Sequence, residues 1–225
     1  MISPESRRIV SRRTRPAKSP LSQEAIVSTA LELLSREGMA GLSLRKVAAA
    51  LDTGPASLYV YVADLNELHV LVLDRVLGEV ELPPEQAGDW RNRLKALLRS
   101  YFGVLLARPG LAQVALSTIP SGPNMMALTE ALLSLLAEGG VDLRRAAWAI
   151  DLLLLQTAAV AAEQDNRRSQ DESELARVAE AVHSVSAEQH PNIHALGDEL
   201  VSGKGDRHDW ALDVLINGVL STPRP

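Results

Sequence analysis

The chain contains no cysteine, which excludes both a disulfide framework and a thiolate metal site. The lack of disulfides fits a reducing compartment, and the N-terminus lacks the apolar run of a signal peptide. Three catalytic motifs are also missing: a phosphate-binding loop, a nucleophile-elbow serine and a Glu-x-x-His pair. These absences argue against an enzyme and predict a cytoplasmic protein.

Long uninterrupted hydrophobic runs are absent as well. The most apolar segment, residues 146–162, is interrupted by Asp151, Gln156 and Thr157 and is short for a membrane span, so it is interpreted as a buried helix. Apolar residues recur at helical spacing through most of the chain, without a convincing strand or internal repeat. With 225 residues, 46% of them hydrophobic, the sequence predicts an all-α protein of two domains.

Charge is distributed unevenly along the chain. The net charge is −5, but residues 1–20 carry six Arg or Lys side chains and one acid, a balance of +5. This segment also contains three prolines and few apolar residues, which predicts a disordered basic arm. Two interpretations remain open: an arm that touches DNA, or a solubilising tail.

Residues 43–67 form the segment around which the chain is organised. Ser43 is a good N-cap for a short helix, residues 52–54 break the apolar pattern, and Pro55 suits the first position of a second helix. Leu58 and Val62 are expected to face inward, while the outward set is Pro55, Ala56, Ser57, Tyr59, Val60 and Tyr61. A helix this short needs support from its neighbours, and one that exposes such residues is typical of a recognition helix in a helix-turn-helix.

Residues 22–80 resemble the DNA-binding domain of the TetR (tetracycline repressor) family. The shared features lie in residues 38–77: the Gly-Leu-Ser turn, the Leu-Arg-x-Val-Ala helix start, the Ser-Leu-Tyr of the recognition helix and the Asp-x-x-Glu-Leu that follows. The C-terminal half resembles the ligand-binding domain of the tetracycline-repressor branch, through Trp90-Arg91, Arg108-Pro109, Gly122-Pro123-Asn124, Pro191-Asn192 and residues 196–199.

The resemblance implies three segments: a disordered arm (1–20), a three-helix DNA-binding domain with the helix-turn-helix (21–66), and a larger helical ligand-binding and dimerisation domain (67–225). A connecting helix is expected over 65–80. The implied function is a ligand-responsive regulator, a repressor released from its operator by a small molecule. The alternative is a helical small-molecule-binding protein with weak or lost DNA binding.

Three positions depart from the family pattern. Asp52 stands where relatives have glycine, although aspartate tolerates a left-handed turn better than most residues. Ala63 and Leu65 stand where relatives often carry phosphate-contacting lysines, which supports the alternative without DNA binding.

DNA contacts divide into those that position the protein and those that read bases. For phosphate, the resemblance implies Ser43, Arg45 and Tyr59, with Lys46 adjacent; the alternative is a cap serine with solvated charges. For bases, the outward set is Pro55, Ala56, Ser57, Val60 and Tyr61, which favours apolar contacts such as thymine methyls. Tyr61 has the alternative of packing against its neighbouring helices.

The resemblance implies a homodimer on a palindromic operator, because one helix-turn-helix covers too few base pairs and paired recognition helices lie about 34 Å apart. A bundle of two helices from each subunit is expected to join the dimer. Residues 146–162 are apolar nearly all round, and the last helix is expected to match them with Trp210, Leu212, Val214, Leu215 and Ile216. The alternative is an internal core.

Candidate ligand contacts are polar or aromatic residues within apolar helices: Trp90, Tyr101, Phe102, Asn124, Met125, Trp148, Asp151, Gln156 and Thr157. Asn124 has the alternative of a helix cap, and Trp148 that of a core residue. No resident cofactor or metal is expected, since Pro191 interrupts the spacing of His183, His190 and His194. The resemblance leaves open a metal that arrives with the ligand.

Overall fold

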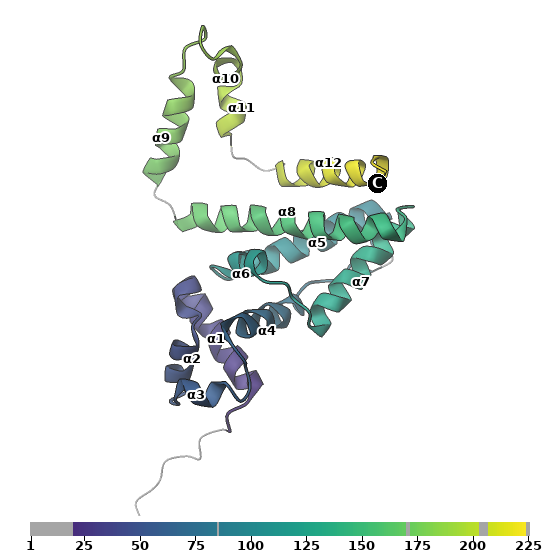
Figure 1. The fold of residues 1–225 in the computed structure, drawn as a ribbon. Helices are drawn as coiled ribbons and strands as arrows, with labels where there is room; N and C mark the ends of the chain where they lie inside the picture. The colour runs from purple at the N-terminus through teal and green to yellow at the C-terminus, as the bar shows by residue number, and fades with distance from the viewer. Residues whose placement is uncertain (1–19, 85, 170–171, 203–206, 224–225) are drawn as a thin grey trace, which may run out of the picture.

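The computed structural model describes residues 20–84, 86–169, 172–202 and 207–223 and is all-α in these ranges (Figure 1). The described residues form twelve α-helices and one 3₁₀ helix, with no strand among them. This confirms the predicted fold class. The predicted basic arm lies outside the described residues, apart from Pro20.

The N-terminal domain, here called the head, is a small helical bundle. Ser22 begins it as an N-cap whose hydroxyl accepts from the backbone N–H of Ala25 at 3.2 Å. Leu34 and Leu58 are fully buried between its helices, as their helical spacing predicts. Its elements are α1 (Gln23–Glu37), η1 (Gly38–Gly41), α2 (Leu44–Ala50) and α3 (Pro55–Leu58).

The turn between α2 and α3 places Asp52 at φ 50°, in the left-handed region. The backbone N–H of Thr53 donates to the Ala48 carbonyl at 2.9 Å, which closes the end of α2. The helix-turn-helix therefore accommodates aspartate at the position where the family has glycine.

Helix α4 (Leu65–Leu77) connects the head to the rest of the chain. The Asp64 carboxylate caps the helix by accepting from the Glu67 N–H at 2.8 Å, and the Glu67 carboxylate accepts from the Ala63 N–H at 2.5 Å, one residue before the cap, so the pair resembles a capping box. The helix ends at Leu77 rather than at residue 80, because Val80 donates to the Leu77 carbonyl in a turn instead of continuing the helix.

The larger domain, here called the body, packs on the other side of α4. Figure 1 shows α8 crossing over α5, α6 and α7, while α9 to α11 project away from the body. The body helices are α5 (Trp90–Leu106), α6 (Leu111–Ser117), α7 (Pro123–Glu138), α8 (Leu143–Ser169) and α12 (Arg207–Ser221). The projecting helices are α9 (Glu172–His183), α10 (Pro191–Ala195) and α11 (Gly197–Val201).

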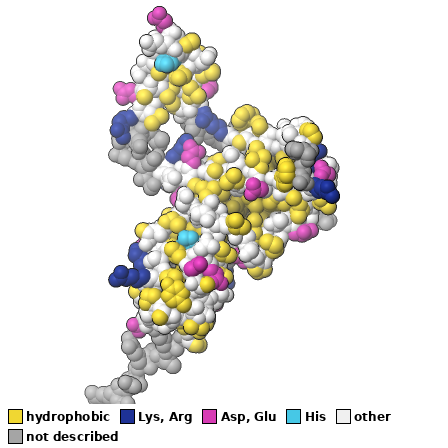
Figure 2. All heavy atoms as spheres, viewed as in Figure 1, with side chains coloured by type: hydrophobic (Ala, Val, Ile, Leu, Met, Phe, Trp, Pro, Cys, Tyr) yellow, Lys and Arg dark blue, Asp and Glu magenta, His cyan; other side chains and the backbone are white. Residues whose placement is uncertain are grey.

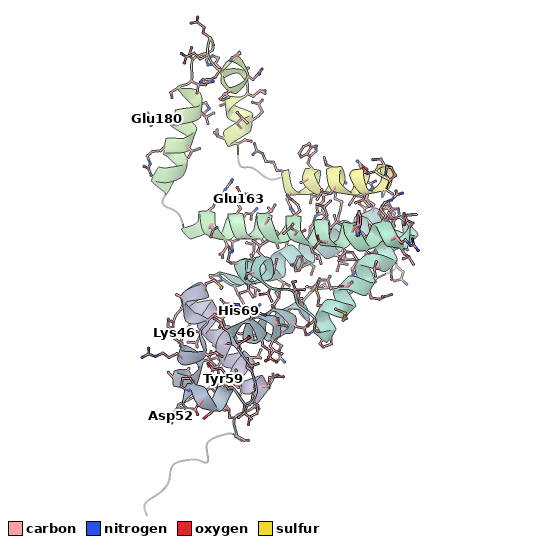
Figure 3. All side chains as sticks on the ribbon, in the orientation of Figure 1. Lys46, Asp52, Tyr59, His69, Glu163 and Glu180 are labelled. Atoms are coloured by element: carbon pink, nitrogen blue, oxygen red, sulfur yellow. The ribbon has the colours of Figure 1, made fainter. Side chains whose placement is uncertain are left out.

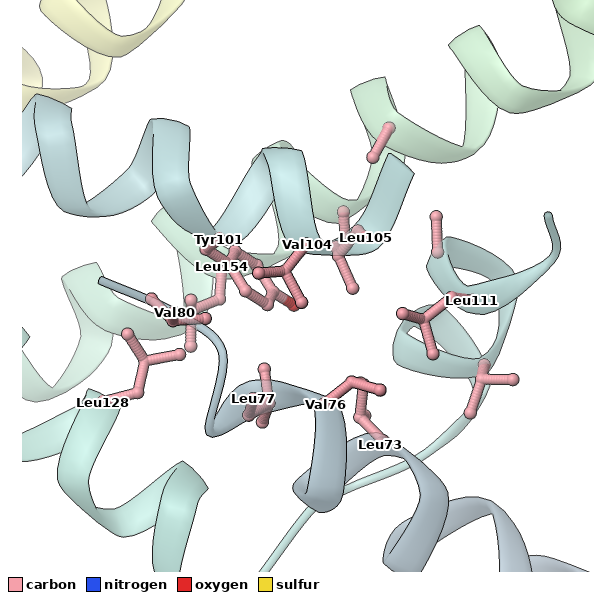
Figure 4. Close-up of a cluster of buried hydrophobic side chains, with 14 of the residues drawn as sticks. Leu73, Val76, Leu77, Val80, Tyr101, Val104, Leu105, Leu111, Leu128 and Leu154 are labelled. Carbon is pink, nitrogen blue, oxygen red and sulfur yellow. The ribbon is translucent and has the colours of Figure 1, made fainter. Parts of the chain in front are cut away.

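One apolar core runs from the head into the body. Figure 4 shows Leu73, Val76 and Leu77 of α4 opposite Tyr101 and neighbouring residues of α5, with α6, α7 and α8 around them. Burial of this apolar surface fixes α4 against both domains. A change in the body can therefore reach the head through α4.

Helix α8 continues through a polar stretch at its C-terminal end. It extends to Ser169 and includes Asp165, Arg167 and Arg168. Asp165 accepts from the Gly110 N–H at 2.6 Å, and Arg168 donates to the Leu106 carbonyl at 3.3 Å. The polar side chains thus anchor the end of α8 to the corner between α5 and α6.

Helix α8 also has the length and composition of a membrane span. Its residues at positions i, i+4 and i+7, such as Ala146, Ile150 and Leu153, are buried against the body. We therefore interpret α8 as the central helix of a helical domain.

Candidate nucleic-acid interface and ligand cavity

Helix α3 and the turn that follows it, residues 59–61, present a mixed apolar and hydroxyl surface to solvent. Val60 is 79% exposed and Tyr59 56% exposed, whereas Leu58 and Val62 are buried beneath them. Pro55, Ala56 and Ser57 are also exposed, and Tyr61 is half-buried. Figure 3 labels Tyr59 on the head. The sequence-predicted outward set is thus brought to one small surface, with Tyr61 at its inner edge.

The start of α2 provides the predicted phosphate-binding residues. Ser43 is the N-cap, and its hydroxyl accepts from the Lys46 N–H at 3.3 Å. The ammonium of Lys46 lies 2.6 Å from a Glu37 carboxylate oxygen, and this hydrogen bond lowers the pKa of Glu37. Arg45 is exposed, and Figure 2 shows basic side chains at this edge of the head. A phosphate would therefore meet Arg45 directly but would compete with Glu37 for Lys46.

A cavity of about 350 Å³ lies between α4 and the body. Leu73 of α4 lines one side, Met125 of α7 another, and Ile150 and Leu154 of α8 a third. Its lining is mostly apolar, which suits a small organic ligand. The remaining lining residues are Tyr101, Ala115, Leu116, Thr118, Ile119, Pro120, Ala147, Asp151, Leu155 and Ala158.

Three polar side chains line this cavity: Tyr101, Thr118 and Asp151. Thr118 is 7% exposed, and its buried hydroxyl has no hydrogen-bond partner among the described residues. Burial raises the pKa of Tyr101, so its hydroxyl keeps its proton at neutral pH and can donate. A buried hydroxyl without a partner is costly, so Thr118 is placed to form a hydrogen bond with an atom that enters the cavity.

Of the nine predicted ligand contacts, the cavity brings together Tyr101, Met125 and Asp151. Trp90 packs against Gly139, where an added Cβ would lie 2.7 Å from the indole ring. Phe102 stacks on His208. These aromatic residues therefore serve packing rather than the cavity.

The other four predicted contacts also lie outside the cavity. Asn124 binds Asp74 through its side-chain amide at 2.9 and 3.2 Å and is not an N-cap, because α7 begins with Gly122 as its cap. Thr157 is buried and donates to the Leu153 carbonyl at 2.7 Å. Trp148 is 57% exposed on the outer face of α8, so it is neither a core residue nor a cavity contact. Gln156 is half-buried and does not line the cavity.

The outer faces of α8 and α12 carry large exposed apolar side chains. Trp148 and Trp210 are 57% and 68% exposed, and Leu152 and Val214 are 44% and 47% exposed. A mostly apolar groove of about 430 Å³ runs between the two helices. Leu212 and Ile216, which were predicted for the same surface, are instead buried inside the chain. The apolar face of α8 and α12 therefore contains fewer residues than expected, but it is exposed to solvent in a single chain.

The three candidate metal-binding histidines do not form a cluster. His183 lies 3.0 Å from Asp198, and His194 lies 3.3 Å from the Val185 carbonyl. No group of three potential metal ligands occurs within the described ranges.

Sequence reasoning missed Thr118, Leu73 and the contact between Asp74 and Asn124. Asp74 was detectable as an acid inside the apolar pattern of α4, LHVLVLDRVL. Thr118 lies at the end of α6, where the sequence carries no comparable signal.

Comparison with known proteins supports this geometry. Residues 26–62 match the family of bacterial regulatory proteins named tetR, and residues 82–222 match the tetracyclin repressor-like C-terminal domain. The chain is 37% identical to the TetR family protein ActR of Streptomyces coelicolor in complex with actinorhodin. That match has a TM-score of 0.83 and covers 90% of this chain and 98% of ActR.

Two curated relatives have repressor or regulator names. One is an HTH-type transcriptional regulator of Saccharopolyspora erythraea, 40% identical over 128 residues, which are 57% of this chain and 53% of the relative. The other is the HTH-type transcriptional repressor DrrR1 of Streptomyces coeruleorubidus, 38% identical over 131 residues, which are 56% of this chain and 48% of the relative. The chain thus spans about half the length of these curated relatives. From its two matched domains, the chain belongs to the TetR family of regulatory proteins, with a tetracyclin repressor-like C-terminal domain.

Proposed function

We propose that this protein is a cytoplasmic, homodimeric repressor that binds a palindromic operator and releases it when a small molecule enters the cavity. The observation that carries this proposal is the position of α4. Its residues pack within the head, and Leu73 on the same helix lines the cavity. A ligand in the cavity therefore contacts α4, the helix that supports the DNA-reading surface.

The recognition surface supports DNA binding through shape and apolar contact. Val60 and Tyr59 project from the turn that follows α3, while Arg45 and the N-terminal end of α2 are placed for phosphate. The surface lacks an arginine or asparagine for bidentate base contacts, so thymine methyl groups are the expected targets.

The exposed apolar face of α8 and α12 supports a dimer. A second copy related by a two-fold axis would cover Trp148 and Trp210 on both chains and form a four-helix bundle. The two copies of α3 could then enter successive major grooves.

The cavity supports a ligand with a large apolar framework and a few oxygen or nitrogen atoms. The relative ActR was solved with actinorhodin, so actinorhodin is a suitable first probe. Such a ligand would contact Tyr101 and Thr118 while its apolar part fills the space beside Leu154.

A titration of labelled DNA from around the protein's own gene tests the proposal. Nanomolar binding that weakens at least about 5-fold with saturating actinorhodin would support it, since allosteric coupling is typically 5- to 150-fold. DNA binding that does not respond to actinorhodin would reject this ligand class. Absence of DNA binding would favour the alternative, a small-molecule-binding protein that has lost its operator.

A further inference from the structure

Asp74 is a buried carboxyl group on α4, 8% exposed, that bonds to the first turn of α7. One of its oxygens accepts from the backbone N–H of Met125 at 2.9 Å, and the other lies 3.5 Å from the Asn124 N–H. The first-turn N–H groups of a helix have no partner within that helix. A side chain of α4 therefore caps a helix of the body.

The side chain of Asn124 strengthens this connection. Its amide donates to the Asp74 backbone carbonyl at 2.9 Å and to the Asp74 carboxylate at 3.2 Å. We call these contacts of Asp74 with Asn124 and Met125 the Asp74 cap. The cap joins residues 50 positions apart with several hydrogen bonds, which fixes both the distance and the rotation between α4 and α7.

Two glycines allow this close approach. A Cβ atom added to Gly122 would lie 2.1 Å from the carboxyl carbon of Asp74, a separation that side chains cannot adopt. A Cβ atom added to Gly78 would lie 3.1 Å from the side-chain oxygen of Asn124. Even one methyl group at Gly122 would therefore push α7 away from α4.

The Asp74 cap lies directly beside the cavity. Leu73, the preceding residue on α4, and Met125, whose N–H enters the cap, both line the cavity. Ile119 and Pro120 line it as well and lead along the chain to Gly122. A ligand that displaces Met125 must therefore move the cap.

We infer that Asp74 is a positioning residue that couples the cavity to the DNA-binding head through its cap on α7. In the empty protein the cap holds α4, and with it α3, in one orientation relative to the body. A ligand that shifts the start of α7 then rotates α4 or breaks the cap. This inference rests on the proposed function for its consequence, although the cap can be tested without ligand or DNA.

The absence of cysteine permits a direct distance measurement in the full-length protein. Cysteines introduced as Val60→Cys on the head and Gln164→Cys on α8 carry spin labels, and labelled chains are diluted into unlabelled ones. The variants Asp74→Asn and Gly122→Ala are compared with Gly103→Ala, a control with nothing within 4 Å of its added Cβ. Asparagine keeps the shape of aspartate but turns an NH₂ group toward an N–H donor of α7.

We expect a narrow distribution of distances between the two spin labels in the parent protein and in Gly103→Ala. The distribution should be broader in Asp74→Asn and should shift to a different mean distance in Gly122→Ala. The inference is overturned when both cap variants give the parent distribution, or when the control changes as much as they do. The second cap variant keeps the test decisive if one of them fails to fold.

Coupling is measured separately with actinorhodin as the probe. We expect the Asp74→Asn variant to bind actinorhodin with an affinity within about 3-fold of the parent protein's. Saturating actinorhodin should raise the DNA dissociation constant of the parent about 10-fold, but should leave that of the variant nearly unchanged. An undiminished effect in this variant would overturn the inference. If actinorhodin leaves the parent's DNA affinity unchanged, the proposed ligand class fails, and the distance measurement still decides the role of Asp74.

Discussion

His208 of α12 stacks on Phe102 of α5, with ring centroids 4.8 Å apart and an angle of 24° between the ring planes. Both ring nitrogens of His208 are buried without a hydrogen-bond partner among the described residues. Burial lowers the pKa of His208, Arg99 lowers it further, and Asp209 opposes the shift. The contact thus joins α12 to α5 through an imidazole that is favoured in its neutral form.

This pairing predicts a loss of stability in mild acid. Above the unfolded-state pKa of 6.5 the imidazole is neutral in both states and contributes no pH dependence. As the pH falls below 6.5, the unfolded chain binds a proton more readily, so the free energy of unfolding decreases by up to about 1.4 kcal/mol per pH unit. His208→Phe should reduce this slope, measured by denaturant unfolding between pH 5 and 7.5. Burial lowers the pKa of His69 as well, so some slope should remain. A parent-like slope in His208→Phe would contradict the prediction.

The turn at Asp52 predicts an order of stability among variants. At φ 50°, alanine suffers a steric penalty that glycine avoids, about 1 kcal/mol. We therefore expect Asp52→Gly to be more stable than Asp52→Ala by roughly this amount. Thermal unfolding of the two variants provides the measurement, and a glycine variant less stable than the alanine variant would refute the strain argument.

The unpartnered hydroxyl of Thr118 predicts opposite effects on stability and ligand binding. Thr118→Val removes a buried polar group and should raise the free energy of unfolding by about 1 kcal/mol. The same change should weaken actinorhodin binding about 10-fold if a ligand atom bonds to this hydroxyl. Thr157→Val is the control, because the Thr157 hydroxyl already donates to Leu153 and lies outside the cavity. A Thr118→Val protein less stable than the parent would show that the hydroxyl has a partner after all.

The apolar face of α8 and α12 predicts that a charge there breaks the dimer. Trp148→Glu should convert a sedimenting dimer into a monomer at micromolar concentration, because an unpaired charge in an interface costs several kcal/mol. Leu82→Glu is a matched control, since Leu82 is 52% exposed in the segment before α5 and does not line the groove between α8 and α12. A parent protein that sediments as a monomer, or a Trp148→Glu variant that remains a dimer, would remove this face from the interface.

The sequence predicted the head more fully than the body. Caps such as Ser43 and Asp64 act on residues three positions away, so their hydrogen bonds follow from local spacing. The inward positions of Leu58 and Val62 follow from helical periodicity and are confirmed by their burial.

The cavity could not be predicted in the same way because it is formed by long-range packing. Trp90, Phe102 and Trp148 are similar in sequence character to Tyr101, yet only helix packing decides which aromatic residue reaches the cavity. The Asp74 contact with Asn124 joins residues 50 positions apart, and no local pattern specifies such a pairing.

The most direct test of the account is the affinity of the exposed α3 surface for DNA. Val60 is 79% exposed, so Val60→Asp should leave the melting temperature nearly unchanged while placing a negative charge against the duplex. In a footprinting titration on DNA from around the protein's own gene, the parent should protect two half-sites about 34 Å apart, and Val60→Asp should bind at least about 100-fold more weakly. Equal protection by the folded Val60→Asp variant would contradict the assignment of α3 as the DNA-reading element.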